Sequence, residues 1–300
     1  MAEPDPPPNE TLGILYAAGA YTFWGVLPVY WHFLGTVPPL ELSFHRMVWC
    51  ALFGAAVSLA VGRRTAIRAA LVNRRVLGAL TISSLLIAVN WTVYIFAVAH
   101  QELVEASLGY YINPLLSIAL GIVMLGEKLS PLRLVAIALA TVAVGFKAIG
   151  LGHFPWIAIT LALSFGFYGY VRKLTPVAAL DGLTIETVLL LPVTAGALLL
   201  WGFQGTGAFA TGHWSRDWLL ILGGPLTALP LAMFAAGARR VRLSTLGFLQ
   251  YLSPSITLAI AVLAFGEPFT RTDAATFGCV WAALALVAVD GRMRRGERRD

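Results

Sequence analysis

Long apolar stretches, separated by short breaks, constrain the fold of this chain more than any other feature of its sequence. A helix that crosses the hydrocarbon core of a bilayer needs about 20 mainly apolar residues. Ten stretches of this kind are present, at residues 11–32, 39–61, 76–99, 104–125, 131–149, 154–172, 182–202, 217–237, 243–265 and 273–290. The breaks leave no room for a soluble domain, and the stretches are too long for the strands of a membrane barrel. We therefore predict an all-α integral membrane protein with ten transmembrane helices.

Charged residues are scarce, as expected of a chain whose solvent is mostly lipid. They make up 12% of the sequence, whereas soluble domains average about 25%. This scarcity excludes a disordered chain, a coiled coil and an ordinary cytosolic enzyme. The net charge of +6 would suggest nucleic acid as the partner of a soluble domain, but here the positions of the charges matter more. We expect membrane lipid and a small-molecule substrate as partners, and no nucleic acid.

The distribution of Lys and Arg predicts the orientation, because these residues accumulate on the cytoplasmic side of membrane proteins. If the N-terminus is cytoplasmic, 17 of the 21 Lys and Arg residues fall in cytoplasmic segments and three fall outside. The remaining one, Arg46, lies within an apolar stretch. We therefore predict that both termini are cytoplasmic, with a disordered tail at residues 1–10 and a basic tail at residues 291–300.

The two halves of the chain resemble each other at an offset of 140 residues. In each half, a proline within an apolar stretch is followed twelve residues later by Gly-Glu. These motifs are Pro114 with Gly126-Glu127, and Pro254 with Gly266-Glu267. We predict two five-helix repeats, at residues 11–149 and 150–290. Because five is odd, the second repeat must enter the membrane from the opposite side, as in many transporters with a substrate site near the midplane. The alternatives are a duplicated bundle without transport function, such as a receptor or scaffold, and a channel.

Polar residues form equivalent stripes in two repeat-related stretches. In each stripe the residues are spaced i, i+3 and i+7, so they share one helical face. The stripes are Tyr110, Asn113 and Ser117 in the first half, and Gln250, Ser253 and Thr257 in the second. Because polar side chains are costly in lipid, we predict that both faces line a shared central cavity. Hydrogen bonding between helices is the alternative.

Pro114 and Pro254 lie within these stripes. Each lacks a backbone N–H and leaves the carbonyl one turn earlier without its helical donor. We predict kinks at both prolines that act as hinges. Purely structural kinks are the alternative, since prolines are frequent in membrane helices.

Ionisable residues inside other stretches are further candidates for the transport path. His45 can titrate near neutral pH, which suggests proton coupling or substrate binding. Its neighbour Arg46 needs a partner or water. Glu186 has the right charge, but the two residues are expected near opposite ends of their stretches, so we do not predict direct contact. The alternative for Glu186 is a charge in the first turns of a helix, where the helix dipole favours it.

Several aromatic residues accompany these polar groups. Asn90 and Tyr94 are spaced i, i+4, and Trp24, Tyr168 and Tyr251 lie in other stretches. Such rings could stack on an apolar or aromatic substrate. Core packing and anchoring at the membrane interface are the alternatives.

The sequence contains no pattern that indicates catalysis. It has no P-loop, no GxGxxG and no Ser/His/Asp grouping in a strand–turn context. Cys50 and Cys279 both lie in apolar stretches and suggest neither a disulfide framework nor a metal site. We expect no enzymatic activity, no cofactor and no metal.

Short motifs along the chain together resemble one transporter family. They are EASLGYYINPL at residues 105–115, LGE at 125–127, LSTLGF at 243–248, His45-Arg46, Asn90-Trp91, Phe167-Tyr168-Gly169, Arg172-Lys173 and Ile185-Glu186-Thr187. The chain is similar, over about residues 11–290, to the RarD-type branch of the drug/metabolite transporter superfamily. The resemblance implies two EamA-type repeats in a multi-pass exporter of the bacterial inner membrane. That superfamily exports amino acids, including aromatic ones, and other small metabolites or drugs, and the RarD name is tied to chloramphenicol sensitivity.

We therefore predict a secondary transporter that exports small metabolites, in particular amino acids, by alternating access around a central cavity. Polar groups would hold the charged ends of the substrate, and rings its apolar part. The polar candidates are His45, Asn90, Asn113 and Gln250, and the rings are Trp24, Tyr94, Tyr110, Tyr168 and Tyr251. The alternatives are a polyspecific drug exporter and a non-transporting receptor or assembly factor. The chain is compatible with a monomer or a homodimer.

Overall fold

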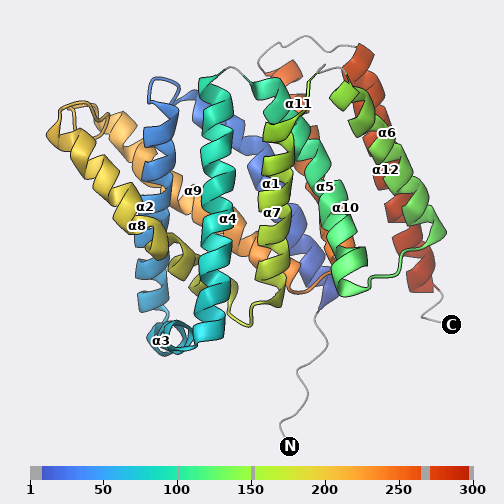
Figure 1. Cartoon of the computed structure of the whole chain (residues 1–300), viewed down its shortest axis with the longest axis horizontal. Helices are drawn as coiled ribbons and strands as arrows, with labels where there is room; N and C mark the ends of the chain where they lie inside the picture. The colour runs from blue at the N-terminus through green and yellow to red at the C-terminus, as the bar shows by residue number, and fades with distance from the viewer. Residues whose placement is uncertain (1–8, 101, 150–152, 265–270, 297–300) are drawn as a thin grey trace, which may run out of the picture. The chain divides into compact units, whose positions relative to one another are not determined.

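The computed structural model describes residues 9–100, 102–149, 153–264 and 271–296, and all regular structure within these ranges is helical (Figure 1). The helices are α1 (Glu10–His32), α2 (Pro39–Ala60), α3 (Arg64–Val72), α4 (Arg74–Ala99), α5 (Leu103–Leu125), α6 (Pro131–Ile149), α7 (Trp156–Leu174), α8 (Ala179–Phe203), α9 (Trp214–Ala238), α10 (Leu243–Gln250), α11 (Leu252–Leu263) and α12 (Arg271–Gly296). The predicted all-α class is confirmed.

Every predicted apolar stretch is helical, and seven segments are long and apolar enough to cross a membrane. These segments lie in α1, α2, α4, α5, α8 and α9, and in the run Leu243–Ile260. Shorter apolar segments occupy Pro131–Gly145 in α6 and Phe277–Asp290 in α12. The chain is therefore a multi-pass membrane protein, while the number of ten spans stays a prediction.

Two helical features differ from the predicted stretches. The nine-residue helix α3 occupies the break between the second and third predicted stretches. The ninth stretch is divided into α10 and α11 at Tyr251. Pro254 explains this division, because it has no N–H to donate to the carbonyl of Gln250 one turn earlier. In contrast, α5 continues through Pro114.

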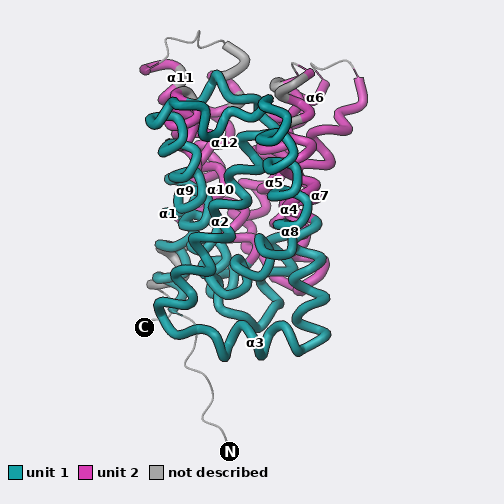
Figure 2. The backbone as a smooth tube through the Cα atoms, turned by 90° about the vertical axis from the view of Figure 1, so that its left-hand side faces the viewer, with its two compact units in different colours: residues 1–23, 34–85, 168–242 teal, residues 24–33, 86–167, 243–300 magenta. Residues whose placement is uncertain are grey.

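The described residues form two compact units, which Figure 2 shows in different colours. Unit 1 consists of residues 1–23, 34–85 and 168–242, and unit 2 of residues 24–33, 86–167 and 243–300. Each unit draws on both halves of the chain, so the predicted division into repeats at 11–149 and 150–290 is not tested by them. Gly266-Glu267 of the second repeat motif lies outside the described residues, as does most of the acidic N-terminal tail.

Each unit has its own core. In unit 1, α2 packs against α8 and α9, and α3 packs against α8. In unit 2, α5 packs against α10, and α6 against α12. The close approach of α5 and α10 requires glycine at Gly247, since a Cβ there would lie 2.6 Å from the carbonyl oxygen of Pro114.

Candidate functional site

The two predicted polar stripes meet in unit 2, where α5 packs against α10. Ser117 Oγ donates a hydrogen bond of 3.3 Å to Oε1 of Gln250, and both side chains are buried. Thr257, further along the second stripe, donates to the carbonyl of Gly25 in α1 at 3.2 Å. Part of each stripe therefore forms hydrogen bonds between helices, which was the alternative to a cavity lining.

Asn113 occupies the middle of the first stripe and is not satisfied by the protein. Its side chain is buried, and within the described part of the chain its carbonyl oxygen Oδ1 has no hydrogen-bond partner. An unsatisfied buried acceptor costs roughly 1–3 kcal/mol, and such a group is often retained for binding water or a ligand. One turn earlier, Tyr110 is 45% exposed and meets the ring of Tyr94 edge-on, with ring centroids 6.2 Å apart.

Asn90 is held by contacts between α4 and α7. Its Nδ2 donates to the carbonyl of Leu161 at 2.9 Å and to Ser164 Oγ at 3.0 Å. Because the amide donors are used in this way, Asn90 retains its carbonyl oxygen for other contacts. Trp24 meets Phe165 of α7 edge-on, with centroids 5.8 Å apart.

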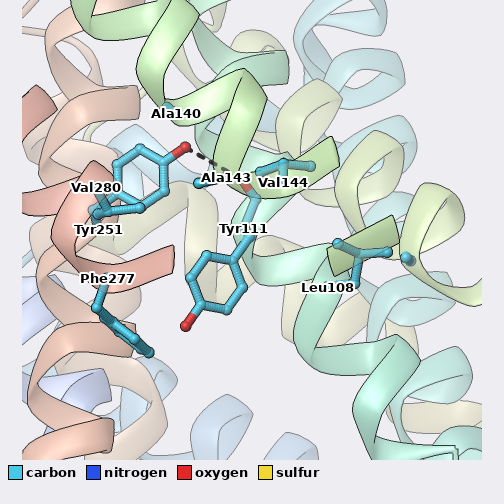
Figure 3. Packing of buried hydrophobic residues seen from close by; sticks show 9 residues of the cluster. Leu108, Tyr111, Ala140, Ala143, Val144, Tyr251, Phe277 and Val280 are labelled. Carbon is cyan, nitrogen blue, oxygen red and sulfur yellow. Dashed lines mark hydrogen bonds between the residues drawn. The ribbon is translucent and has the colours of Figure 1, made fainter. Parts of the chain in front are cut away.

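Tyr251 is a core residue of unit 2. It is fully buried in an apolar cluster with Tyr111 and Phe277, and its hydroxyl donates to the carbonyl of Tyr111 at 3.3 Å (Figure 3). This environment corresponds to core packing, the alternative to substrate stacking. Ser253, in the first turn of α11, is half-buried.

His45 and Arg46 lie side by side in α2 of unit 1 and have different partners. His45 is buried against the ring of Phe209, and its Nε2 is 3.7 Å from Oε1 of Glu41. Glu41 also accepts a hydrogen bond of 2.5 Å from the backbone N–H of Ala208. Arg46 donates from Nε to Thr227 Oγ1 of α9 at 3.2 Å.

Glu186 is the centre of a buried polar network in unit 1. One carboxylate oxygen, Oε1, is 3.5 Å from Nε of Arg172 and also accepts a hydrogen bond from Ser83. The other, Oε2, accepts from the hydroxyl of Tyr168 at 3.4 Å. Glu186 is 1% exposed, so its interpretation as an interfacial charge at a helix end is wrong. The expectation that it does not pair with Arg46 agrees with these contacts.

Arg172 is a functional candidate that sequence reasoning missed. It was expected to be a cytoplasmic anchor, but its side chain is fully buried, and no described residue forms a hydrogen bond with Nε or Nη1. A Cβ at Gly182 would overlap its guanidinium, so glycine makes room for this cation. A buried carboxylate in a membrane helix requires a cation nearby, and Glu186 was the signal that could have located one.

Two carboxylates from the family-like motifs cap helices. Glu105 Oε1 accepts from the backbone N–H of Ile157 at 2.7 Å, at the start of α7. Glu127 accepts from the N–H groups of Leu243 and Ser244 at 2.6 and 3.0 Å, at the start of α10. Carboxylates are favourable at helix N-termini, where N–H groups lack helical partners.

One group of possible metal ligands occurs among the described residues. Ligand atoms of Glu102, Glu105 and His153 lie within 4.8 Å of one another. The capping of α7 accounts for the buried Glu105, and His153 is half exposed. The expectation of no metal stays a prediction.

The fourteen candidate residues are divided between the units. His45, Arg46, Tyr168 and Glu186 belong to unit 1, and the other ten, together with Pro114 and Pro254, belong to unit 2. Contacts within the units join Tyr94 to Tyr110, Ser117 to Gln250, and Tyr168 to Glu186, whereas the contacts described above for the other candidates are with residues outside the predicted set.

Comparison with known proteins connects these features to a family. The model of the EamA-like transporter family matches residues 11–147. The chain is 44% identical to the Uncharacterized transporter YojE of Bacillus subtilis, with 91% of this chain and 92% of the relative covered. It is 38% identical to Protein RarD of Escherichia coli, with coverage of 93% and 94%.

A solved structure supports the fold. A protein crystal structure aligns with a TM-score of 0.70 at 20% identity, covering 94% of this chain and 98% of the other. Together with the relatives and the membrane-spanning helices, these matches show a membrane transporter. The chain belongs to the EamA-like transporter family, in the RarD-type group of drug/metabolite transporters.

Proposed function

We propose that this transporter exports small metabolites, with amino acids as the substrate class, by alternating access around a central cavity between two inverted five-helix repeats. The proposal places ten spans in the bacterial inner membrane, with both termini in the cytoplasm. The observation that carries it is the buried side-chain carbonyl of Asn113, which has no hydrogen-bond partner among the described residues although Ser117 of the same stripe donates to Gln250.

The chemistry of the stripe fits a zwitterion. The carbonyl of Asn113 can accept a hydrogen bond from an ammonium group. Gln250 accepts from Ser117 through Oε1, so its amide Nε2 is directed to other acceptors, such as a carboxylate. The Tyr94–Tyr110 pair offers an aromatic surface for an apolar side chain.

His45 and Arg46 remain candidates for the same path, His45 because neither of its ring nitrogens forms a hydrogen bond with the described residues. For Tyr168 and Glu186, the network with Arg172 supports a role in holding the helices of unit 1. Pro254 supports a hinge, since α10 ends one turn before it.

The test is uptake of radiolabelled amino acids into proteoliposomes that contain the full chain, with and without a pH gradient. Replacing Asn113 by leucine keeps the side-chain size and removes the acceptor. A hydrogen bond to a charged group contributes about 1.5–3 kcal/mol, so we expect uptake at low substrate concentration to fall about 10-fold or more. Val123→Leu, at an exposed position of the same helix, is the matched control.

The outcomes separate the alternatives. If no amino acid is transported, the substrate class is wrong. Competition by lipophilic cations would indicate the polyspecific drug exporter instead. If uptake does not depend on the pH gradient, proton coupling through His45 is excluded.

A further inference from the structure

The short helix α3 has the position expected of a helix at the boundary between membrane and water. It joins α2 and α4, which both contain candidate spans. Figure 1 shows α3 nearly end-on, beside the ends of these two helices, and Figure 2 shows it crossing the end of unit 1. A helix in this position lies along the interface, as amphipathic interfacial helices do.

The apolar residues of α3 are directed in two ways. Ile67 and Ala70 pack into a cluster with Leu80 of α4 and Ile185 of α8. The last two residues, Leu71 and Val72, are 44% and 74% exposed. Exposed apolar side chains at this depth are suited to contact with acyl chains.

Four arginines lie on either side of these exposed residues in the sequence, and no contact within the described ranges occupies their side chains. They are Arg64 and Arg68 in α3, and Arg74 and Arg75 at the start of α4. All four are exposed, and within the described ranges none has an ion pair or a side-chain hydrogen bond. Residues 61–80 contain no Asp or Glu.

Arg63, the fifth arginine of this segment, differs from the other four. It forms an ion pair of 2.7 Å with the buried Asp181, and this hydrogen bond raises the pKa of its guanidinium. Arg63 is therefore a structural residue that joins α3 to α8.

The positions of the four arginines make an external anion favourable. Arg64 begins α3, and Arg74 and Arg75 occupy the first turn of α4, whose N–H groups are capped by Asn73. The N-terminal end of a helix carries partial positive charge, so cations there are unfavourable unless an anion lies close.

We propose that Arg64, Arg68, Arg74 and Arg75, named here the arginine surface, bind the headgroups of anionic phospholipids. The phosphate would lie between the guanidinium groups, which suit phosphate oxygens. Leu71 and Val72 would meet the acyl chains, a contact that free phosphate lacks. This inference does not depend on the identity of the transported substrate.

The test measures lipid retained by the full chain, purified in neutral detergent, using native mass spectrometry with phosphatidylglycerol and phosphatidylcholine in equal amounts. We expect a preference for phosphatidylglycerol. Each arginine near a membrane surface contributes about a fivefold preference. Replacing Arg74 and Arg75 by glutamine should lower the preference about 25-fold, and replacing all four should abolish it.

Two control variants separate location from charge. Replacing all four arginines of the arginine surface by lysine keeps the charge and should retain most of the preference for phosphatidylglycerol. Four Arg→Gln replacements in the C-terminal segment, at Arg292, Arg294, Arg295 and Arg298, change the net charge equally and should lower the preference for phosphatidylglycerol much less than the four replacements in the arginine surface. The melting temperature in detergent verifies folding, and the Arg74/Arg75 pair serves if the quadruple variant does not fold.

Four results would overturn the inference. The native chain could retain both lipids equally, or the quadruple glutamine variant could keep its preference. The C-terminal variant could lose as much preference, which would indicate net charge alone. Displacement of phosphatidylglycerol by millimolar inorganic phosphate would show a free-phosphate site instead.

Discussion

Removal of Arg172 is the sharpest test of the buried network in unit 1. The replacement Arg172→Met keeps much of the side-chain volume and leaves the carboxylate of Glu186 without its cation. With the 3.5 Å separation and an effective dielectric constant of about 20, the lost attraction is about 5 kcal/mol. Broken buried ion pairs in other proteins cost about 3–5 kcal/mol, in the same range.

The assay is the apparent melting temperature of the purified protein in neutral detergent, at a fixed heating rate because unfolding of such proteins is often irreversible. Each kcal/mol of lost stability lowers the melting temperature of a chain of this size by about 2–3 °C, so Arg172→Met should lower the apparent melting temperature by about 6–15 °C. The exposed Arg68→Met is the control and should change it little.

The double variant Arg172→Met/Glu186→Gln distinguishes pairing from packing. If the loss arises from an uncompensated charge, the double variant should recover most of the stability of the native chain, because neither buried charge remains. A double variant whose loss equals the sum of the two single losses would refute the pairing. A loss below about 2 °C for Arg172→Met would refute it as well.

Three further predictions follow from close contacts. Gly182→Ala places a methyl group on the guanidinium of Arg172 and should lower the free energy of unfolding by about 1–3 kcal/mol. In a chain that already carries Arg172→Met, the same replacement should cost much less, which a double-mutant cycle of thermal unfolding measures. Ser117→Ala and Gln250→Leu should show a coupling energy of about 1 kcal/mol in a double-mutant cycle, and strict additivity would contradict the hydrogen bond. Pro254→Ala restores a backbone donor, so it should slow the transport cycle while leaving substrate binding in equilibrium assays nearly unchanged; equal rates would argue against a hinge.

The apolar stretches predicted the helices well because length and hydropathy are local properties of the sequence. Pro254, which separates α10 from α11, also acts through a local property, the missing N–H. The sequence alone, however, predicted a kink at this proline and not a division at Tyr251. Helix α3 was missed because its nine residues are amphipathic and therefore do not form an apolar stretch.

The environment of Glu186 could not be predicted for two reasons. Helix α8 begins at Ala179 instead of residue 182, which places Glu186 seven residues, or about 10 Å, inside the helix. Its partner Arg172 belongs to a different helix, and spacing along one helix does not identify which neighbour a side chain faces. For the same reason, the sequence could not distinguish the buried core position of Tyr251 from an exposed ring.

The division between α10 and α11 affects how mutational scans of this transporter should be interpreted. Because Pro254 has no N–H, the main-chain oxygen of Gln250 lacks its helical donor, and no replacement of the Gln250 side chain can remove that oxygen. Replacing Gln250 by alanine leaves that main-chain oxygen in place and removes only the side-chain amide. A contact made by the main chain at this point would be detected through replacement of Pro254, a residue that does not itself provide the contact.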